Sequence, residues 1–101
     1  MTTFRYLSPA RGELRNAAHY YRERSRRVAT SFMIEVQRAV DQILEFPESA
    51  PLIRGHVRGK VVARFPYTLM YRVVDEVVVI LAVAHHRQRP EFWIDRGRDQ
   101  P

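Results

Sequence analysis

The sequence contains no cysteine, which excludes disulfide bonds, thiolate metal ligands and a cysteine nucleophile. A reducing compartment suits such a chain, and we expect it in the cytoplasm. No apolar run approaches the roughly 20 residues that a membrane helix needs. The N-terminus also lacks a charged region followed by a long apolar stretch. The sequence therefore predicts a soluble, uncleaved protein without a membrane partner.

Lysine and acidic residues are scarce. The net charge is +6, and Lys60 is the only lysine among 17 cationic residues. Codon usage in a GC-rich genome could explain the preference for arginine, but it does not explain clustering. No acidic residue lies between Glu48 and Asp75, while several cations do. We therefore expect acidic partners such as nucleic acid, the ribosome or an acidic protein. The residues predicted to form one basic face are Arg58, Lys60, Arg64 and Arg72.

Glycine is also rare, and the 4 glycines form neither a phosphate-binding loop nor a dinucleotide-binding motif. No cofactor is expected. With 101 residues, 46% of them hydrophobic, the chain is predicted to form one domain over residues 1–101.

The first half of the chain has the pattern of a strand followed by two helices. Residues 4–7 are expected to be a strand, with Ser8 as a helix N-cap and Pro9 at the first helical position. Apolar residues then recur at helical spacing over 10–21 and 28–43. Ser25 is the expected cap between the two helices, and Pro47 ends the second. So short a connection predicts an antiparallel helical hairpin.

Carboxylates on the second helix are expected to lie on its polar side, where they would pair locally with Arg38 and have no catalytic role. They are Glu35, Asp41 and Glu45.

Three β-rich runs follow at 57–65, 67–74 and 77–85, and they predict an antiparallel meander. The third run is apolar on both faces, so we expect it to be central. The helices would cover one of its faces, and a partner or the C-terminal tail the other. The first run carries several cations, which is typical of an exposed edge. The predicted fold is α+β, ordered β-α-α-β-β-β, with a helical hairpin packed on a mainly antiparallel sheet.

The histidines invite a metal interpretation. His85 and His86 are neighbours on a predicted strand, so their side chains should point to opposite faces and cannot easily share one ion. His19 and His56 are interpreted as surface residues. We expect no metal site.

The C-terminal tail combines cations and rings at close spacing, and these residue types are enriched in binding hot spots. Its predicted target-binding residues are Arg87, Arg89, Phe92, Trp93 and Arg96. Alternatively, the two rings fold back over the open face of the sheet. Both interpretations hold if the rings anchor the tail while the arginines face outward.

An ordered set of short motifs resembles a known family. It comprises Phe65-Pro66-Tyr67, Tyr71-Arg72-Val73, an apolar strand ending in Ala82-Val83-Ala84-His85-His86-Arg87, then Arg89-Pro90-Glu91-Phe92-Trp93 and a late Arg96. Over residues 4–96 this set resembles the ParE branch of the RelE/ParE toxins of bacterial toxin-antitoxin modules, also called plasmid stabilisation proteins. The resemblance implies the same fold, inhibition of DNA gyrase by binding, and neutralisation by a small acidic antitoxin.

The RelE branch of the same family, which cuts messenger RNA on the ribosome, is the alternative. In that case His85 or His86 would transfer protons, and Lys60, Arg64, Arg72 and Arg87 would hold phosphates. The RelE branch typically uses a late tyrosine, whereas this chain has none after Tyr71. The aromatic residues Phe92 and Trp93 stand in the tail instead, and phenylalanine has no proton to donate. A third alternative is a decayed toxin that retains only antitoxin binding.

Overall fold

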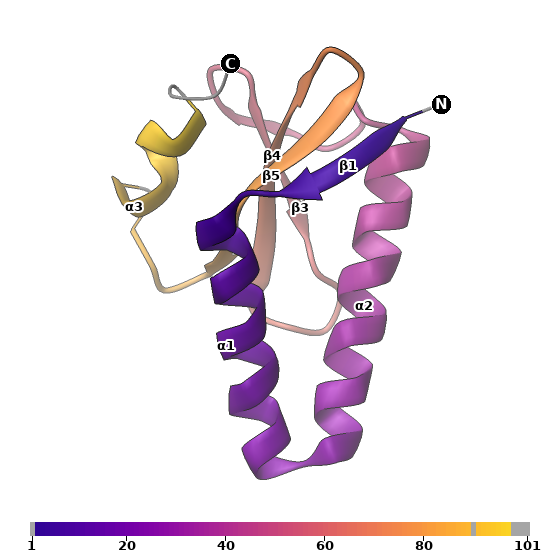
Figure 1. Cartoon of the computed structure of the whole chain (residues 1–101), viewed down its shortest axis with the longest axis vertical. Coiled ribbons are helices and arrows are strands. Elements are labelled where there is room, and N and C mark those ends of the chain that lie inside the picture. The colour runs from indigo at the N-terminus through magenta and orange to yellow at the C-terminus, as the bar shows by residue number, and fades with distance from the viewer. Residues whose placement is uncertain (1, 90, 98–101) are drawn as a thin grey trace.

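Two long helices pack side by side against one face of a five-stranded sheet (Figure 1). The structure is a computed structural model and describes residues 2–89 and 91–97. Its elements are β1 (Thr3–Tyr6), α1 (Ser8–Arg24), α2 (Arg26–Glu45), β2 (Leu52–Arg54), β3 (Val57–Val61), β4 (Tyr67–Val74), β5 (Val77–His85), α3 (Glu91–Ile94) and the 3-10 turn η1 (Asp95–Gly97). The predicted α+β fold and the order of its elements are confirmed.

The strand order is β1-β5-β4-β3-β2, with β1 parallel to β5 and the other pairs antiparallel. The predicted meander and the interior position of β5 are confirmed. The prediction that the 57–65 run forms an exposed edge is wrong, because the short β2 pairs with β3 on that side. A strand of 3 residues is too short to show an alternating pattern. The run also ends as a strand at Val61 rather than at residue 65.

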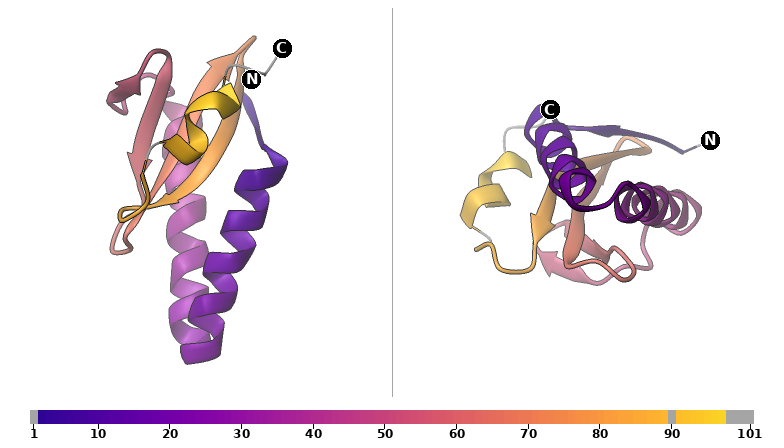
Figure 2. Two further views of the ribbon diagram at one scale, coloured as in Figure 1. Left: turned by 90° about the vertical axis from the view of Figure 1, so that its left-hand side faces the viewer. Right: turned by 90° about the horizontal axis from the view of Figure 1, so that it is seen from below.

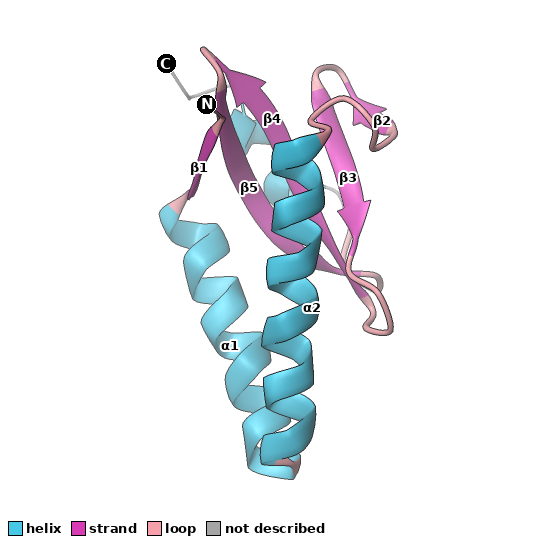
Figure 3. Ribbon diagram, turned by 90° about the vertical axis from the view of Figure 1, so that its right-hand side faces the viewer, coloured by secondary structure: helices cyan, strands magenta, loops and turns pink. Residues whose placement is uncertain are grey.

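The two helices form the predicted antiparallel hairpin, which projects beyond the end of the sheet (Figure 3). The Ser25 hydroxyl accepts a hydrogen bond from the Val28 amide at 3.3 Å, so the predicted cap of α2 is confirmed. The prediction for Ser8 is wrong by one residue. Leu7 holds the N-cap position of α1 with no side-chain cap, so Pro9 lies in the first turn but one position later than predicted. No helix within residues 2–89 and 91–97 is long and apolar enough to cross a membrane.

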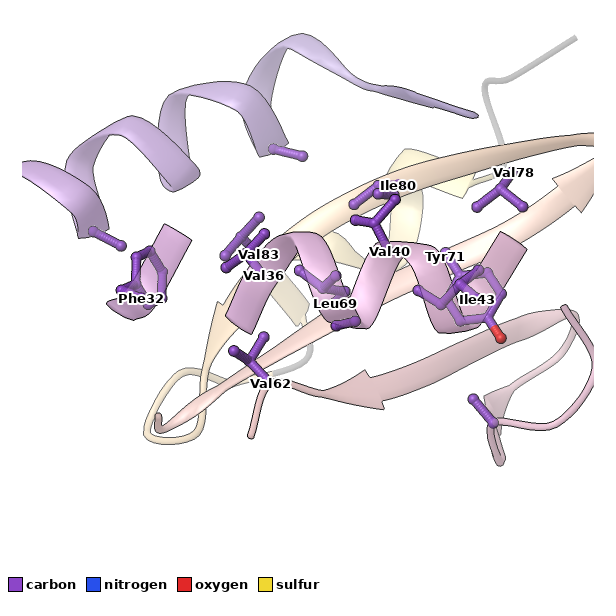
Figure 4. Close-up of a cluster of buried hydrophobic side chains, with 14 of the residues drawn as sticks. Phe32, Val36, Val40, Ile43, Val62, Leu69, Tyr71, Val78, Ile80 and Val83 are labelled. Carbon is purple, nitrogen blue, oxygen red and sulfur yellow. The ribbon is translucent and has the colours of Figure 1, made fainter. Parts of the chain in front are cut away.

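The main core lies between the helices and the sheet, and its largest contributors from α2 are Phe32, Val36, Val40 and Ile43 (Figure 4). Glu35 departs from the prediction that it lies on the polar side of α2, since it is buried. Its Oε2 atom lies 3.3 Å from the guanidinium of Arg38 and 3.8 Å from that of Arg64 in the β3–β4 loop. Because that loop approaches α2 next to Glu35, the carboxylate is shielded from water but remains paired.

A bulge interrupts the pairing of β4 with β5. Met70 is opposite Ala82 and Tyr71 is opposite Ile80, so Leu81 is left without a partner on β4. Bulges shift the side-chain alternation of a strand. Ile80 accordingly packs in the core under the helices, whereas Leu81 and Ala82 both belong to a second cluster on the opposite face.

The C-terminal segment covers that second face. In the right-hand view of Figure 2, α3 and α2 lie on opposite sides of the sheet. We expected either a partner or the C-terminal tail to cover the open face of β5. In the structure the tail covers it. The doubly apolar sequence of β5 is thus explained by burial on both faces within one chain.

Candidate functional site

Trp93 anchors the C-terminal segment to the sheet. Its side chain is only 2% exposed and packs with a cluster that includes Leu7, Val57 and Leu81. Phe92 is half-buried beside the same cluster, with the Arg96 guanidinium 5.1 Å from its ring centre. The rings therefore fold back over the sheet, as the alternative interpretation of the tail expected.

Arg96 faces inward, contrary to the expectation that the tail arginines all face outward. It binds both oxygens of Glu13 on α1, at 3.1 and 2.9 Å, and donates to the Leu81 carbonyl at 3.0 Å. A negative side chain within reach in the fold is what turns this arginine inward, and sequence spacing gives no sign of it. The contact ties the last turn of the described chain to the first helix.

Arg87 and Arg89 are exposed on the turn that follows β5. Two hydrogen bonds fix the conformation of this turn. The Gln88 side chain accepts from the His85 amide at 2.8 Å, and the His86 amide donates to the Pro66 carbonyl at 2.9 Å. Of the five residues predicted to bind a target, these two present their charge to solvent, while Trp93 and Arg96 hold the segment in place.

Of the four residues predicted to share a basic face, Arg58 and Lys60 lie two apart on β3 and share one face of the sheet, whereas Arg72 does not join them. Arg58 is opposite Tyr71 in the sheet, so Arg72, the next residue on β4, projects from the other face. Arg58 donates to the carbonyls of Glu48 at 2.9 Å and Ala50 at 2.7 Å, which fixes the loop after α2. Arg64 lies near Glu35, and Lys60 is opposite Leu69. The position of Arg72 on the opposite face from Arg58 and Lys60 follows from register, which a count of charges cannot give.

The two neighbouring histidines contact different residues. The ring of His85 meets Tyr67 edge-on at 5.1 Å between centroids, and His86 Nε2 lies 3.1 Å from Thr68 Oγ1. Because Tyr67 and Thr68 are consecutive on β4, the two imidazoles lie on opposite faces, as predicted. Among the described residues, no three histidine or acidic side chains gather as metal ligands would.

A groove on the helical hairpin was not predicted from the sequence. It has a volume of about 560 Å³ and is lined by Arg22, Arg26, Ala29, Thr30, Met33, Ile34 and Gln37. Met33 is 40% exposed and Ile34 is 47% exposed, which is high for side chains of this type. The signal in the sequence was a pair of apolar residues outside the buried helical stripe. An apolar floor with two arginines suits an acidic, amphipathic segment.

Comparisons with known proteins agree with this architecture. Residues 4–90 match the model of a family described as the ParE toxin of the type II toxin-antitoxin system, parDE. The fold is similar to a solved structure of the chromosomal ParDE toxin-antitoxin system from P. aeruginosa, with a TM-score of 0.65 and 18% sequence identity. That match covers 84% of this chain and 96% of the other. A sequence comparison with curated proteins found no match. Because the family model spans most of the sequence, the chain belongs to the ParE toxin family of type II toxin-antitoxin systems.

Proposed function

We propose that this ParE-family toxin inhibits DNA gyrase by binding, through the exposed arginines of its anchored C-terminal segment. In that segment some side chains anchor the chain to the sheet and others are exposed to solvent, and this observation carries the proposal. Trp93 is buried and Arg96 is paired with Glu13, while Arg87 is exposed on a turn that hydrogen bonds fix after β5. A binding surface fixed in advance loses little conformational entropy when its target docks. Both gyrase and the alternative target, the ribosome, place the proposed action in the cytoplasm.

Dispersal of the candidate nuclease groups supports binding rather than turnover. General acid-base chemistry on RNA needs proton-transferring and phosphate-binding groups around one reacting atom. Here Arg64 lies near Glu35, Arg72 is on the face covered by α3, and His85 packs on Tyr67. Arg72 is thus on the opposite side of the sheet from α2 and does not converge with Arg64. A ribosome-dependent RNA endonuclease, with messenger RNA as substrate, remains the second candidate because the fold is shared with RelE and function depends on the site.

Two assays in parallel test the target. Purified toxin is added to a gyrase supercoiling reaction and, separately, to ribosomes carrying messenger RNA. Inhibited supercoiling with intact messenger RNA supports the proposal. Cleaved messenger RNA with normal supercoiling would overturn it in favour of the second candidate. If neither reaction responds while an antitoxin still binds, the chain is a decayed toxin.

A cognate acidic antitoxin is the second part of the proposal. The groove on the hairpin combines exposed Met33 and Ile34 with Arg22 and Arg26, and the whole chain carries a net charge of +6. An acidic segment studded with apolar residues could fold into this groove, and charge attraction would speed the encounter. The proposed complex is a hetero-oligomer of toxin and antitoxin.

Affinity for the protein encoded by the adjacent reading frame tests this part at low and high salt. We expect tight binding that weakens as salt rises. Met33→Glu would place a like charge against the acidic segment and should weaken binding. Val73→Glu, a change at another exposed apolar residue on β4, is the matched control and should bind normally. If the protein does not bind at either salt concentration, neutralisation by it is refuted. Equal binding by both variants would show that the groove is not the antitoxin site.

A further inference from the structure

A second, smaller cavity lies beside Trp93, on the face of the sheet that α3 covers. It has a volume of about 230 Å³ and is distinct from the groove on the hairpin. Three of its lining side chains are basic, and the other lining groups are mostly apolar. The full lining is Arg54, Gly55, His56, Val57, Arg72, Trp93 and Ile94.

Sheet register brings these residues together from three separate parts of the sequence. Gly55 adopts a left-handed φ of 56°, which lets the chain turn between β2 and β3 and places Arg54 opposite Val57. Because Arg58 is opposite Tyr71, Val57 lies beside Arg72 on the neighbouring strand. The tail then contributes Trp93 and Ile94 from α3.

The chemistry of the lining fits an anion. None of the described residues that line the cavity is acidic, and two are arginines, whose planar guanidinium groups match phosphate and carboxylate oxygens. Arg72 is half-buried, whereas Arg54 and His56 are exposed at the rim. A wall of Val57, Trp93 and Ile94 lowers the local dielectric constant and so strengthens the attraction for a bound charge.

The size of the cavity restricts what it can hold. Pockets for drug-sized ligands usually span about 300 to 1,000 Å³, and this one is smaller. A single charged group with a small apolar part would fill this cavity, whereas a whole nucleotide would be too large to fit inside it. We propose that this cavity is an anion-binding site that takes one phosphate or carboxylate group. The proposal does not depend on gyrase or on an antitoxin.

Trp93 provides the test because it is the only tryptophan in the chain. The full-length protein is titrated with inorganic phosphate and, in a second series, with acetate, while chloride keeps the ionic strength constant. Trp93 fluorescence and the indole N–H signal in NMR spectra report on occupancy. We expect a saturable change in at least one series. A response to phosphate alone would define a phosphate site, and a response to both anions a general anion site.

Variants locate the site. Arg54→Ala and His56→Ala both alter exposed residues of the turn, and each should weaken binding, by about tenfold for the arginine. Arg15→Ala, a change at an exposed arginine on α1, is the matched control and should bind like the unaltered protein. Circular dichroism checks that all three remain folded. The proposal is overturned if neither anion gives a saturable change, or if Arg54→Ala and Arg15→Ala bind with equal affinity.

Discussion

Glu13 and Arg96 form an ion pair, 2.9 Å from Oε2 to the guanidinium nitrogen, that completes the edge of the sheet where β1 ends. Pairing of β1 with β5 stops near Ile80, whose carbonyl accepts from the Leu7 amide at 3.0 Å. Beyond that point the Leu81 carbonyl accepts from Arg96 at 3.0 Å, and the Val83 amide donates to Glu13 at 3.0 Å. The two side chains thus satisfy backbone groups of β5 that β1 does not reach, and they hold η1 against α1.

Removal of this pair should destabilise the fold. The side chains of Arg96 and Glu13 are only 20% and 21% exposed, so water replaces the lost bonds poorly. We expect Arg96→Ala to lower the free energy of unfolding by about 1 to 3 kcal/mol. Urea denaturation measures the change, with Arg15→Ala as the control for loss of an exposed arginine. A variant as stable as that control would show that the pair contributes nothing.

Much of the fold could be predicted because local patterns determine it. Ser25 caps α2 as expected, and the unbroken apolar run of β5 correctly indicated a strand covered on both faces. The bulge at Leu81 could not be predicted, because a strand that is apolar everywhere keeps the same pattern when its alternation shifts. The edge strand β2 was missed because its pairing with β3 depends on tertiary context.

The sequence indicated a tail of cations and rings that folds back over the sheet, but not the role of each side chain in it. Cations and rings near the C-terminus indicated a functional segment, yet nothing local distinguishes Arg96, which binds Glu13, from Arg89, which is exposed. The partner of Arg96 lies 83 residues away in the sequence. Likewise, Arg58 and Arg72 fall on opposite faces only because of the register between β3 and β4.

The exposed arginines of the tail should matter to the target and not to the antitoxin. We expect the double variant Arg87→Ala with Arg89→Ala to weaken gyrase inhibition at least about tenfold, because arginine is a frequent hot-spot residue. Its affinity for the antitoxin should be unchanged, since the proposed groove is on the helical hairpin. Dose-response curves for supercoiling and a binding titration give the two values. Unchanged inhibition by the folded variant would remove these residues from the target surface.

Deletion of the whole segment is a less specific test of the same surface. Removal of the chain from Arg89 onward, or Trp93→Ala together with Arg89→Ala, also removes a buried ring. Loss of a buried tryptophan costs about 3 to 5 kcal/mol. Such variants should therefore lose stability as well as inhibition, and circular dichroism is needed before their activity is interpreted. A truncated protein that stays folded and inhibits gyrase normally would show that the segment is structural cover alone.

The histidine pair should be dispensable for toxicity. His85 packs edge-on against Tyr67, and His86 shares one polar contact with Thr68. If neither transfers a proton, His85→Ala and His86→Ala should cost about 1 kcal/mol of stability and leave growth inhibition largely intact. Removal of a general acid or base typically lowers a rate by about a hundredfold or more. Loss of growth inhibition in a stably folded variant, measured on induction in culture, would therefore favour the nuclease.

Alkaline pH should weaken the fold through Tyr71. Burial raises the pKa of its phenol above the ordinary value of 10.0, although the nearby Arg58 acts in the opposite direction. As pH rises past 10.0, the phenol loses its proton in the unfolded chain before it does so in the folded one. Ionisation therefore stabilises the unfolded state relative to the folded state. The folding stability present at lower pH is lost as the pH rises through the raised pKa.

Tyr71→Phe isolates this effect. At neutral pH the variant lacks the 2.7 Å hydrogen bond from the Tyr71 hydroxyl to the Pro47 carbonyl, and it should be less stable by about 1 kcal/mol. Because phenylalanine cannot ionise, that deficit should shrink as pH rises above about 10.

Burial also raises the pKa of Tyr6, Tyr21 and Tyr67, so the Tyr71→Phe variant should still lose some stability in base. Thermal unfolding as a function of pH gives both curves, with Tyr20→Phe, at an exposed ring, as the control. A deficit that stays constant across this range would mean that Tyr71 does not contribute to alkaline unfolding.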